Sequence, residues 1–459
     1  MQLAAVGYRL KPRRRSELGL LIVGGIAILY ATLLPSLAAT GALPGDELRV
    51  VIGLVGIAFV VQVINRRLVP DANPVMMPVA LVLNGLGYVM ISRLTPNPTT
   101  AAEAGQQFAW TVIGLVVYTA VLLAVRRSRD LERYRYLMLF FAFGLLVAPI
   151  LPVIGLSVGG ARLWVHLGSI QFQPVELAKI LLVVFFASYF IEKRELLTIP
   201  TRRVGNHLLP DLRAFGPFAV AAVMSLFVIL AEHDIGFALL LFVVFLSLLW
   251  LTTGRWTYLA IGIIAFIAAT FVASHLLYQV DQRITVWLDP WTSYNTRGGG
   301  YQPVQGEFAF ARGGLYGSGL GLGIPGVIPV NTSDFIFAAL GEELGLFGTA
   351  AIVCAFLLLI GSGLHAALQA RSEFSKLCAA GLTVLLGFQA FFIMAGVTRL
   401  LPLTGVTLPF VSYGGSSLVA NYALLAVLMR ISDEGNQDAL SAPSWSSTSA
   451  DTVIGTGNP

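Results

Sequence analysis

The run "DFIFAALGEELGLFGTAAIVCAFLLLIGSGL", residues 334–364, is long and apolar enough to cross a lipid bilayer. A hydrocarbon core of about 30 Å is spanned by about 20 predominantly apolar residues in an α-helix. The whole chain has a matching composition, because 56% of its 459 residues are hydrophobic and only 12% are charged. Soluble proteins carry about 25% charged residues. The sequence therefore predicts an integral membrane protein.

Twelve apolar segments of this kind recur along the chain, which predicts an all-α polytopic membrane protein with about 12 transmembrane helices. They are residues 18–40, 49–65, 75–92, 108–125, 136–157, 174–192, 215–231, 235–252, 257–277, 334–364, 376–397 and 407–430. We expect a basic cytoplasmic N-terminus at 1–17, a single transmembrane domain at 18–431 and a disordered cytoplasmic tail at 432–459. The tail is polar, with too little apolar surface to fold.

The distribution of charge supports this topology, because cytoplasmic segments of membrane proteins carry an excess of Lys and Arg. With both termini in the cytoplasm, 21 of the 29 Lys and Arg residues fall on the inner side and seven fall in outer loops. The remaining one, Lys179, lies within a span. The net charge of +5 thus reflects the orientation of the chain in the membrane, and it favours binding to anionic membrane lipid. It does not indicate a nucleic-acid partner.

The large predicted outer loop, 278–333, is longer than a simple connection requires. It contains Arg283 and Arg312, and glycines are frequent between residues 313 and 323. These glycines lack the sequence context of a Walker loop or a dinucleotide-binding loop. Two interpretations stay open: tight turns with close packing, or backbone N–H groups that form an anion-binding concavity beside Arg312.

A second outer loop carries Arg162 and Trp164 and leads into a span that begins near Pro174. Glu176 and Lys179 lie three residues apart in that span and hence on one helix face. A lysine inside a membrane span must pair with another group or line a cavity. The two residues therefore form either a structural ion pair or a contact with substrate.

Three carboxylates stand at the front of the 334–364 span. Asp334 either complements the positive end of the helix dipole or acts chemically at the outer mouth of a cavity. Glu342 and Glu343 lie about 12 Å further along a straight helix. At that depth charged side chains are functional or tightly paired.

Four motifs, in order across residues 155–430, resemble those of the SEDS family (shape, elongation, division and sporulation). They are "GARLWVHLGSIQFQPVELAK", "YQPVQGEFAFARGGLYGSGLG", "SDFIFAALGEELGLFG" and "LPLTGVTLPFVSYGGSSL". Two additional N-terminal spans are similar to the actinobacterial RodA-type members, with FtsW-type members as the near alternative. The resemblance implies a plasma-membrane glycosyltransferase that polymerises lipid II into peptidoglycan during elongation, with a class B penicillin-binding transpeptidase as partner.

The resemblance also implies roles for individual residues. Asp334 corresponds to the essential acid of the family and is expected to act as a general base. The residues expected to bind substrate are Arg162, Trp164, Glu176, Lys179, Arg283, Arg312 and Ser412. Division-type members carry a Lys where this chain has Thr404, and Arg399 is a candidate replacement. A divalent cation, Mg²⁺ or Mn²⁺, is a further source of positive charge for a pyrophosphate leaving group.

Two other classes of function compete with this hypothesis. The same cavity and charges suit a lipid II flippase or secondary transporter, although transporters show inverted repeats that are not evident in this sequence. A scaffold that only positions the transpeptidase is the third class. Polymerase activity without translocation of lipid would separate the three.

Overall fold

The chain is described here by a computed structural model covering residues 14–41, 45–94, 101–151, 154–158, 161–167, 170–198, 202–204, 207–209, 235–292 and 299–441. Its helices are α1 (Arg14–Thr40), α2 (Gly45–Leu68), α3 (Met76–Leu94), α4 (Ala101–Ala124), α5 (Ser128–Arg133), α6 (Arg135–Val147), α7 (Val175–Glu192), α8 (Arg194–Thr198), α10 (Ile235–Thr253), α11 (Trp256–Leu276), α12 (Tyr278–Leu288), α14 (Tyr301–Gly313), α15 (Ile336–Gln369), α16 (Glu373–Val397) and α17 (Gly415–Ser441). Short 3-10 turns occur at Ala148–Ile150 and Pro325–Val327.

Within the described part of the chain, nine helices are long and apolar enough to cross a membrane: α1, α2, α3, α4, α10, α11, α15, α16 and α17. Each of them falls on one of the predicted spans. This confirms a polytopic helical membrane protein. The predicted span at 174–192 forms α7, which is largely buried and carries three charged residues. The predicted span at 215–231 lies outside the described residues.

The predicted span at 136–157 is wrong in its second half, and the chain is not purely helical. Helix α6 ends at Val147, and a three-stranded antiparallel sheet follows, made of β1 (Gly155–Val158), β2 (Ala161–Leu167) and β3 (Ile170–Phe172). Leu156 of β1 pairs with Trp164 of β2. A second, two-stranded sheet joins β4 (Arg202–Val204) and β5 (His207–Leu209).

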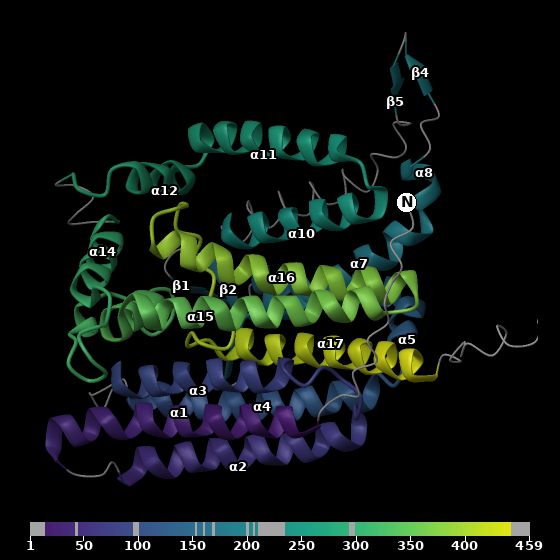
Figure 1. Cartoon of the computed structure of the whole chain (residues 1–459). Helices are drawn as coiled ribbons and strands as arrows, with labels where there is room; N and C mark the ends of the chain where they lie inside the picture. Colours follow the sequence, from purple (N-terminus) through teal and green to yellow (C-terminus); the bar gives the residue numbers. More distant parts are fainter. Residues whose placement is uncertain are drawn as a thin grey trace, which may run out of the picture.

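Helix α17 runs through the middle of the bundle, between α4, α7, α15 and α16 (Figure 1). Its residues 418–429 are apolar except for Asn421, and all of them are buried, a pattern typical of a helix that is enclosed rather than amphipathic. Leu424, Leu425 and Ala426 are all fully buried. The hydrophobic core therefore centres on this helix.

The C-terminal boundary of the ordered bundle lies further along the chain than the predicted residue 431. Helix α17 continues to Ser441, and Ser432 and Asp433 are buried. The carboxylate of Asp433 accepts a hydrogen bond of 2.7 Å from the backbone N–H of Asp71. This part of the predicted tail is thus helical, because it packs against the α2–α3 connection. Residues 442–459 lie outside the described residues.

Segments predicted to lie on opposite sides of the membrane lie at opposite ends of the bundle (Figure 1). Helices α12 and α14, from the large predicted outer loop, cover one end. Helices α5 and α8 and the last turns of α17, all predicted to be cytoplasmic, lie at the other end. The large loop is therefore structured, since its described residues form two helices and a 3-10 turn.

Helix α15 consists of two segments that meet at a kink. Gly345 has φ 66° and ψ −165°, a conformation that only glycine adopts readily. A Cβ atom at Gly345 would also lie 2.2 Å from the backbone nitrogen of Gly317. Because residues 336–344 are not collinear with residues 346–369, distance along the helix does not report depth in the membrane. Glu342 and Glu343 lie before the kink, in the same 336–344 segment, so their expected position about 12 Å deeper than Asp334 stays a prediction.

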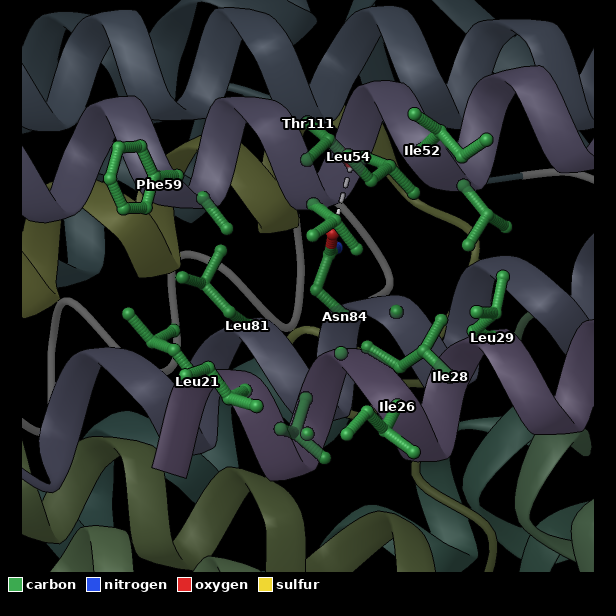
Figure 2. A pocket seen from close by; sticks show the side chains of 18 of the residues that line it. Leu21, Ile26, Ile28, Leu29, Ile52, Leu54, Phe59, Leu81, Asn84 and Thr111 are labelled. Atoms are coloured by element: carbon green, nitrogen blue, oxygen red, sulfur yellow. Dashed lines mark hydrogen bonds between the residues drawn. The ribbon is translucent and has the colours of Figure 1, made fainter. Parts of the chain in front are cut away.

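The N-terminal helices α1 and α2 pack beside α3 and α4 and line an open apolar cavity of about 350 Å³ (Figure 2). The hydroxyl of Thr111 donates to the side-chain carbonyl of Asn84 at 3.2 Å, at the edge of this cavity. The amide of Asn84 in turn donates to the backbone carbonyl of Phe410 at 3.2 Å. The N-terminal hairpin thus lies against residues that support the loop between α16 and α17.

Candidate active site

Asp334 lines a cavity of about 300 Å³ together with two arginines, Arg283 and Arg399. The cavity lies at the end of the bundle covered by α12 and α14 (Figure 1). Its walls come from α12, from the first turn of α14 and from the loop that follows α16. A carboxylate and two guanidinium groups therefore face one space, although they are far apart in the sequence.

Arg283 is oriented by the loop between α16 and α17. Its Nη1 donates to the backbone carbonyls of Leu403 at 3.2 Å and Thr404 at 3.1 Å. Neutral carbonyls hold the guanidinium in place without cancelling its charge. The positive charge of Arg283 is thus available to an anion in the cavity.

Arg399 is held more tightly than Arg283. Its Nη1 pairs with Oε1 of Glu307 at 2.5 Å, and its Nη2 donates to the carbonyl of Trp287 at 3.2 Å. The indole N–H of Trp287 donates back to the Arg399 carbonyl at 3.0 Å. The backbone of Arg399 is left-handed, with φ 58°. Such a conformation in a residue other than glycine costs roughly 1–3 kcal/mol and persists only where surrounding contacts impose it.

The backbone on the N-terminal side of Asp334 is fastened to the segment before α17. The hydroxyl of Ser412 donates to the carbonyl of Ser333 at 2.7 Å and accepts from the N–H of Leu408 at 2.9 Å. The backbone N–H of Tyr413 donates to the carbonyl of Thr332 at 2.8 Å. The structure therefore places Ser412, which was predicted to bind substrate, in contact with the backbone that carries Asp334.

Tyr413 itself points away from that backbone and bonds to α4. Its hydroxyl donates to the side-chain carbonyl of Gln106. Burial raises the pKa of Tyr413, and the nearby carboxylate of Glu103 raises it further. The phenol therefore stays protonated and remains a hydrogen-bond donor.

Glu176 and Lys179 form a buried ion pair inside the bundle, as the structural interpretation of their spacing predicts. Lys179 is 1% exposed, and its Nζ also donates to Oε1 of Gln389 at 2.6 Å. The side-chain amide of Gln389 donates a hydrogen bond to the carbonyl of Thr407 at 3.0 Å. Neither charged residue lines the Asp334 cavity. The pair thus supports the loop that holds Arg283, at a distance from the cavity itself.

The two predicted residues of the second outer loop lie in strand β2. Trp164 is partly buried in that strand. Arg162 also belongs to β2 by its backbone, and its side chain lies outside the described residues. Trp164 does not line the Asp334 cavity. Of the predicted site residues, the cavity brings together Asp334 and Arg283.

Arg312 does not line this cavity, because it pairs with a different carboxylate. Its Nη1 lies 3.3 Å from Oε1 of Glu342. The glycine-rich segment beside it offers N–H groups, but they bond to the protein's own acids: Gly321 donates to Glu343 at 3.3 Å and Ile324 donates to Glu342 at 2.9 Å. Close packing is therefore the interpretation of the glycines that the structure favours over an open anion-binding concavity.

Several cavity residues were missed by sequence reasoning. Gln282 and Trp287 from α12 and Gln302 from α14 all line the cavity, and Glu307 orients Arg399. Gln302 and Glu307 lie inside the quoted motif "YQPVQGEFAFARGGLYGSGLG", so that motif was the available signal. Gln282 and Trp287 lie outside any quoted motif, so nothing in the sequence indicated that they line this cavity.

The donor set in the cavity bears on the expected divalent cation. Among the described residues, no group of three or more His, Cys, Asp and Glu side chains lies close enough to hold a metal ion. The described wall of the cavity contributes a single carboxylate, Asp334. Mg²⁺ commonly binds through one or two carboxylates together with substrate phosphates. A cation here would thus depend on phosphate from a bound substrate.

The fold and this cavity define the class: a multi-pass helical membrane protein with a positively charged site at one membrane face and one carboxylate inside it. The chain belongs to the FtsW/RodA/SpoVE cell cycle protein family, whose model matches residues 74–437. That range excludes α1 and α2, which are additions to the family core.

Relatives with curated names show the same affiliation. The chain is 39% identical to a protein of Mycobacterium tuberculosis named peptidoglycan glycosyltransferase RodA, over 93% of this chain and 92% of that protein. It is 41% identical to the protein of the same name from Mycobacterium leprae, over 82% of this chain and 81% of that protein. A Geobacter protein named probable peptidoglycan glycosyltransferase FtsW is 36% identical over 63% of this chain and 76% of that protein.

Solved structures show the same fold. A chain from a peptidoglycan synthase complex, described as coordinating polymerization and crosslinking, superposes with a TM-score of 0.65 at 24% identity. The match covers 81% of this chain and 99% of that chain. The crystal structure of Thermus thermophilus RodA superposes with a TM-score of 0.54 at 24% identity, over 79% of this chain and 96% of that chain.

Proposed function

We propose that this chain is a peptidoglycan glycosyltransferase of the bacterial plasma membrane that polymerises lipid II, with Asp334 as its general base. The observation that carries the proposal is the cavity in which Asp334 lies with Arg283 and Arg399. A base and a pyrophosphate-binding pair are the two things that this reaction needs. The names of the relatives support the same activity.

The reaction can proceed as a single displacement. The 4-hydroxyl of an acceptor sugar attacks the anomeric carbon of the donor, and the bond from that carbon to the pyrophosphate oxygen breaks. The hydroxyl proton passes to the carboxylate of Asp334, and polyprenyl pyrophosphate leaves. An α-linked donor gives a β-linked product, so one inversion suffices and no covalent enzyme intermediate is needed. General base catalysis of this kind contributes typically about 10²- to 10⁴-fold.

The leaving pyrophosphate needs positive charge more than it needs a proton. Arg283 and Arg399 can supply it, because guanidinium groups bind phosphate oxygens with two parallel hydrogen bonds. Arg283 is one of the three arginines predicted from the sequence. Arg312 pairs with Glu342 instead, and the prediction for Arg162 stays open because its side chain lies outside the described residues. A Mg²⁺ or Mn²⁺ ion arriving with the pyrophosphate would add positive charge to the same group.

The proposed partner is a class B penicillin-binding transpeptidase. The similarity to a chain from a complex that couples polymerization to crosslinking supports this assignment. An elongation role is favoured over a division role, because the RodA-named mycobacterial relatives are 39–41% identical to this chain. The FtsW-named relatives are 32–36% identical. Rescue of rod shape in cells depleted of their elongation polymerase, without rescue of division, would support this choice.

The direct test is polymerisation of pure lipid II by the purified protein, with and without its co-purified transpeptidase. Asp334→Ala is expected to abolish strand formation while the protein stays correctly folded and inserted. Normal rate and strand length from Asp334→Ala would remove the general base assignment. Transport of labelled lipid II across vesicles without polymerisation would favour the flippase hypothesis, and stimulation of a partner without either activity would favour the scaffold.

A further inference from the structure

Four charged side chains from three helices meet at the kink in α15. Glu342 and Glu343 are each 1% exposed. Glu343 forms an ion pair with Arg93 at the end of α3, and Glu342 pairs with Arg312 at the end of α14. Buried carboxylates are stable only where charge and hydrogen bonds compensate the loss of water. We name these four residues the kink cluster.

The kink cluster fastens the loop that connects α14 to Asp334. Glu342 accepts the N–H of Ile324 at 2.9 Å, and Glu343 accepts the N–H of Gly321 at 3.3 Å. Arg93 donates from Nη2 to the carbonyl of Gly323 at 3.3 Å. The hydroxyl of Ser318 donates to the backbone carbonyl of Glu342 at 2.9 Å. Loop residues 318–324 are thus bonded to both acids and to one arginine.

The cluster also fixes one end of the segment that begins with Asp334. Residues 336–344 form a short helical segment that starts two residues after Asp334 and stops at the kink. The other end is held by the hydrogen bond from Ser412 to Ser333. Asp334 therefore lies on a short stretch of backbone with a buried anchor on each side.

The kink cluster also contacts α14, the helix that forms another wall of the cavity, because Arg312 belongs to that helix. Gly313, at the end of α14, packs so closely that an added Cβ would lie 2.1 Å from the carbonyl oxygen of Gly341. The first turn of α14 contributes Gln302 to the cavity. Arg93 belongs to α3, a helix of the central bundle, so its pair with Glu343 connects both cavity walls to that bundle.

We propose that Arg93 and Glu343 are positioning residues for the reaction: their buried ion pair sets the placement of Asp334 relative to Arg283 and Arg399. Neither residue lines the cavity, so they act through the loop and the 336–344 segment. The predicted loss of kcat in variants of this ion pair rests on the proposed function. The predicted loosening of the backbone around Asp334 does not depend on any activity.

The test combines kinetics with hydrogen exchange on the purified full chain. Arg93→Ala and Glu343→Gln are expected to lower kcat for lipid II by about 10- to 100-fold, because small displacements of a reacting group have effects of that size. The KM for lipid II should change by less than about threefold, since Arg283 and Arg399, which bind the pyrophosphate, keep their own contacts. Amides of residues 317–324 and 333–344 should exchange faster. Arg93→Lys, which keeps the charge, should recover most of the rate.

Arg194→Ala is the matched control, because it removes an exposed ion pair of 3.5 Å with Glu373 at the other end of the bundle. It should alter neither exchange in these segments nor kcat. If Arg93→Ala does not fold, Glu343→Gln, which preserves side-chain volume, carries the test.

Two results would overturn the proposal: unchanged exchange in residues 317–324 and 333–344, or faster exchange there with wild-type kcat. Equal losses in Arg93→Ala and Arg93→Lys would also count against it, because charge pairing would then be irrelevant. If the wild-type protein makes no glycan, the proposed function fails, while the exchange measurements still report whether the ion pair holds the Asp334 segment.

Discussion

The hydroxyl of Ser412 donates a 2.7 Å hydrogen bond to the backbone carbonyl of Ser333, the residue before Asp334. These residues lie 79 positions apart in the chain. The serine begins the motif "SYGGSS", which runs into the first turn of α17, the most buried of the nine apolar helices found in the described residues. The Ser412 side chain therefore connects the bundle core to the backbone beside the candidate general base.

Ser412→Ala tests whether this contact positions Asp334 or binds substrate. Loss of both hydrogen bonds of the Ser412 hydroxyl should cost about 1–3 kcal/mol of stability. A positioning role predicts that kcat falls about tenfold with little change in the KM for lipid II. A rise in KM with unchanged kcat would instead support the substrate-binding role predicted from the sequence. Steady-state kinetics on lipid II, with thermal unfolding in detergent, separates the two.

Glu307→Gln should lower kcat/KM for lipid II, because it removes the carboxylate that holds Arg399 in place. The carboxylate and guanidinium are 2.5 Å apart, and both are mostly shielded from solvent. Without its partner, Arg399 loses the orientation that directs it into the cavity, and kcat/KM should fall about tenfold. Arg399→Ala should have a larger effect, because it also removes the charge. Glu373→Gln, in an exposed ion pair at the other end of the bundle, is the control; equal activities of all three variants would contradict the assignment.

Lys179→Met should destabilise the protein strongly. Removing one partner of a buried ion pair leaves the other charge uncompensated, at a cost of about 3–5 kcal/mol. The double substitution Glu176→Gln with Lys179→Met removes both charges and should recover much of that loss. Unfolding in detergent monitored by circular dichroism gives the comparison. A double variant no more stable than Lys179→Met would show that the pair is not the source of the effect.

Gly317→Ala should perturb the loop that leads to Asp334. Gly317 has φ 84°, and a Cβ there would lie 2.1 Å from the carbonyl oxygen of Glu343. Both the backbone conformation and the contact oppose a side chain, so we expect reduced thermal stability and reduced polymerisation. Gly326→Ala is the matched control in the same loop, because no atom lies within 4 Å of its added Cβ. Similar melting temperatures for the two variants would contradict this account.

Asp334→Asn should reduce kcat by about 10²- to 10⁴-fold, because the amide cannot accept the hydroxyl proton. The substitution keeps the size of the side chain, so stability should change little. The measurement is glycan strand synthesis from pure lipid II at saturating concentration. A variant with more than about a tenth of the wild-type kcat would show that another group accepts the proton.

Sequence alone was enough to predict a polytopic helical membrane protein and to locate the runs that form the nine long apolar helices of the described residues. A span is a local property: about 20 consecutive apolar residues must leave water, whatever their neighbours are. Motif resemblance likewise identified the family and singled out Asp334. The close spacing of Glu176 and Lys179 predicted their ion pair, because three residues make most of one helical turn.

Which distant side chains share a space depends on how the helices pack. Arg399 is paired with Glu307 across 92 positions of the chain, and Arg312 is taken up by Glu342 instead of the Asp334 cavity. The kink at Gly345 also depends on a segment that is not its neighbour in sequence, because the backbone of Gly317 packs directly against it. Local patterns report which groups leave water. Only the packing of helices against one another decides which buried charges meet, because each must find its partner wherever the fold brings one within reach.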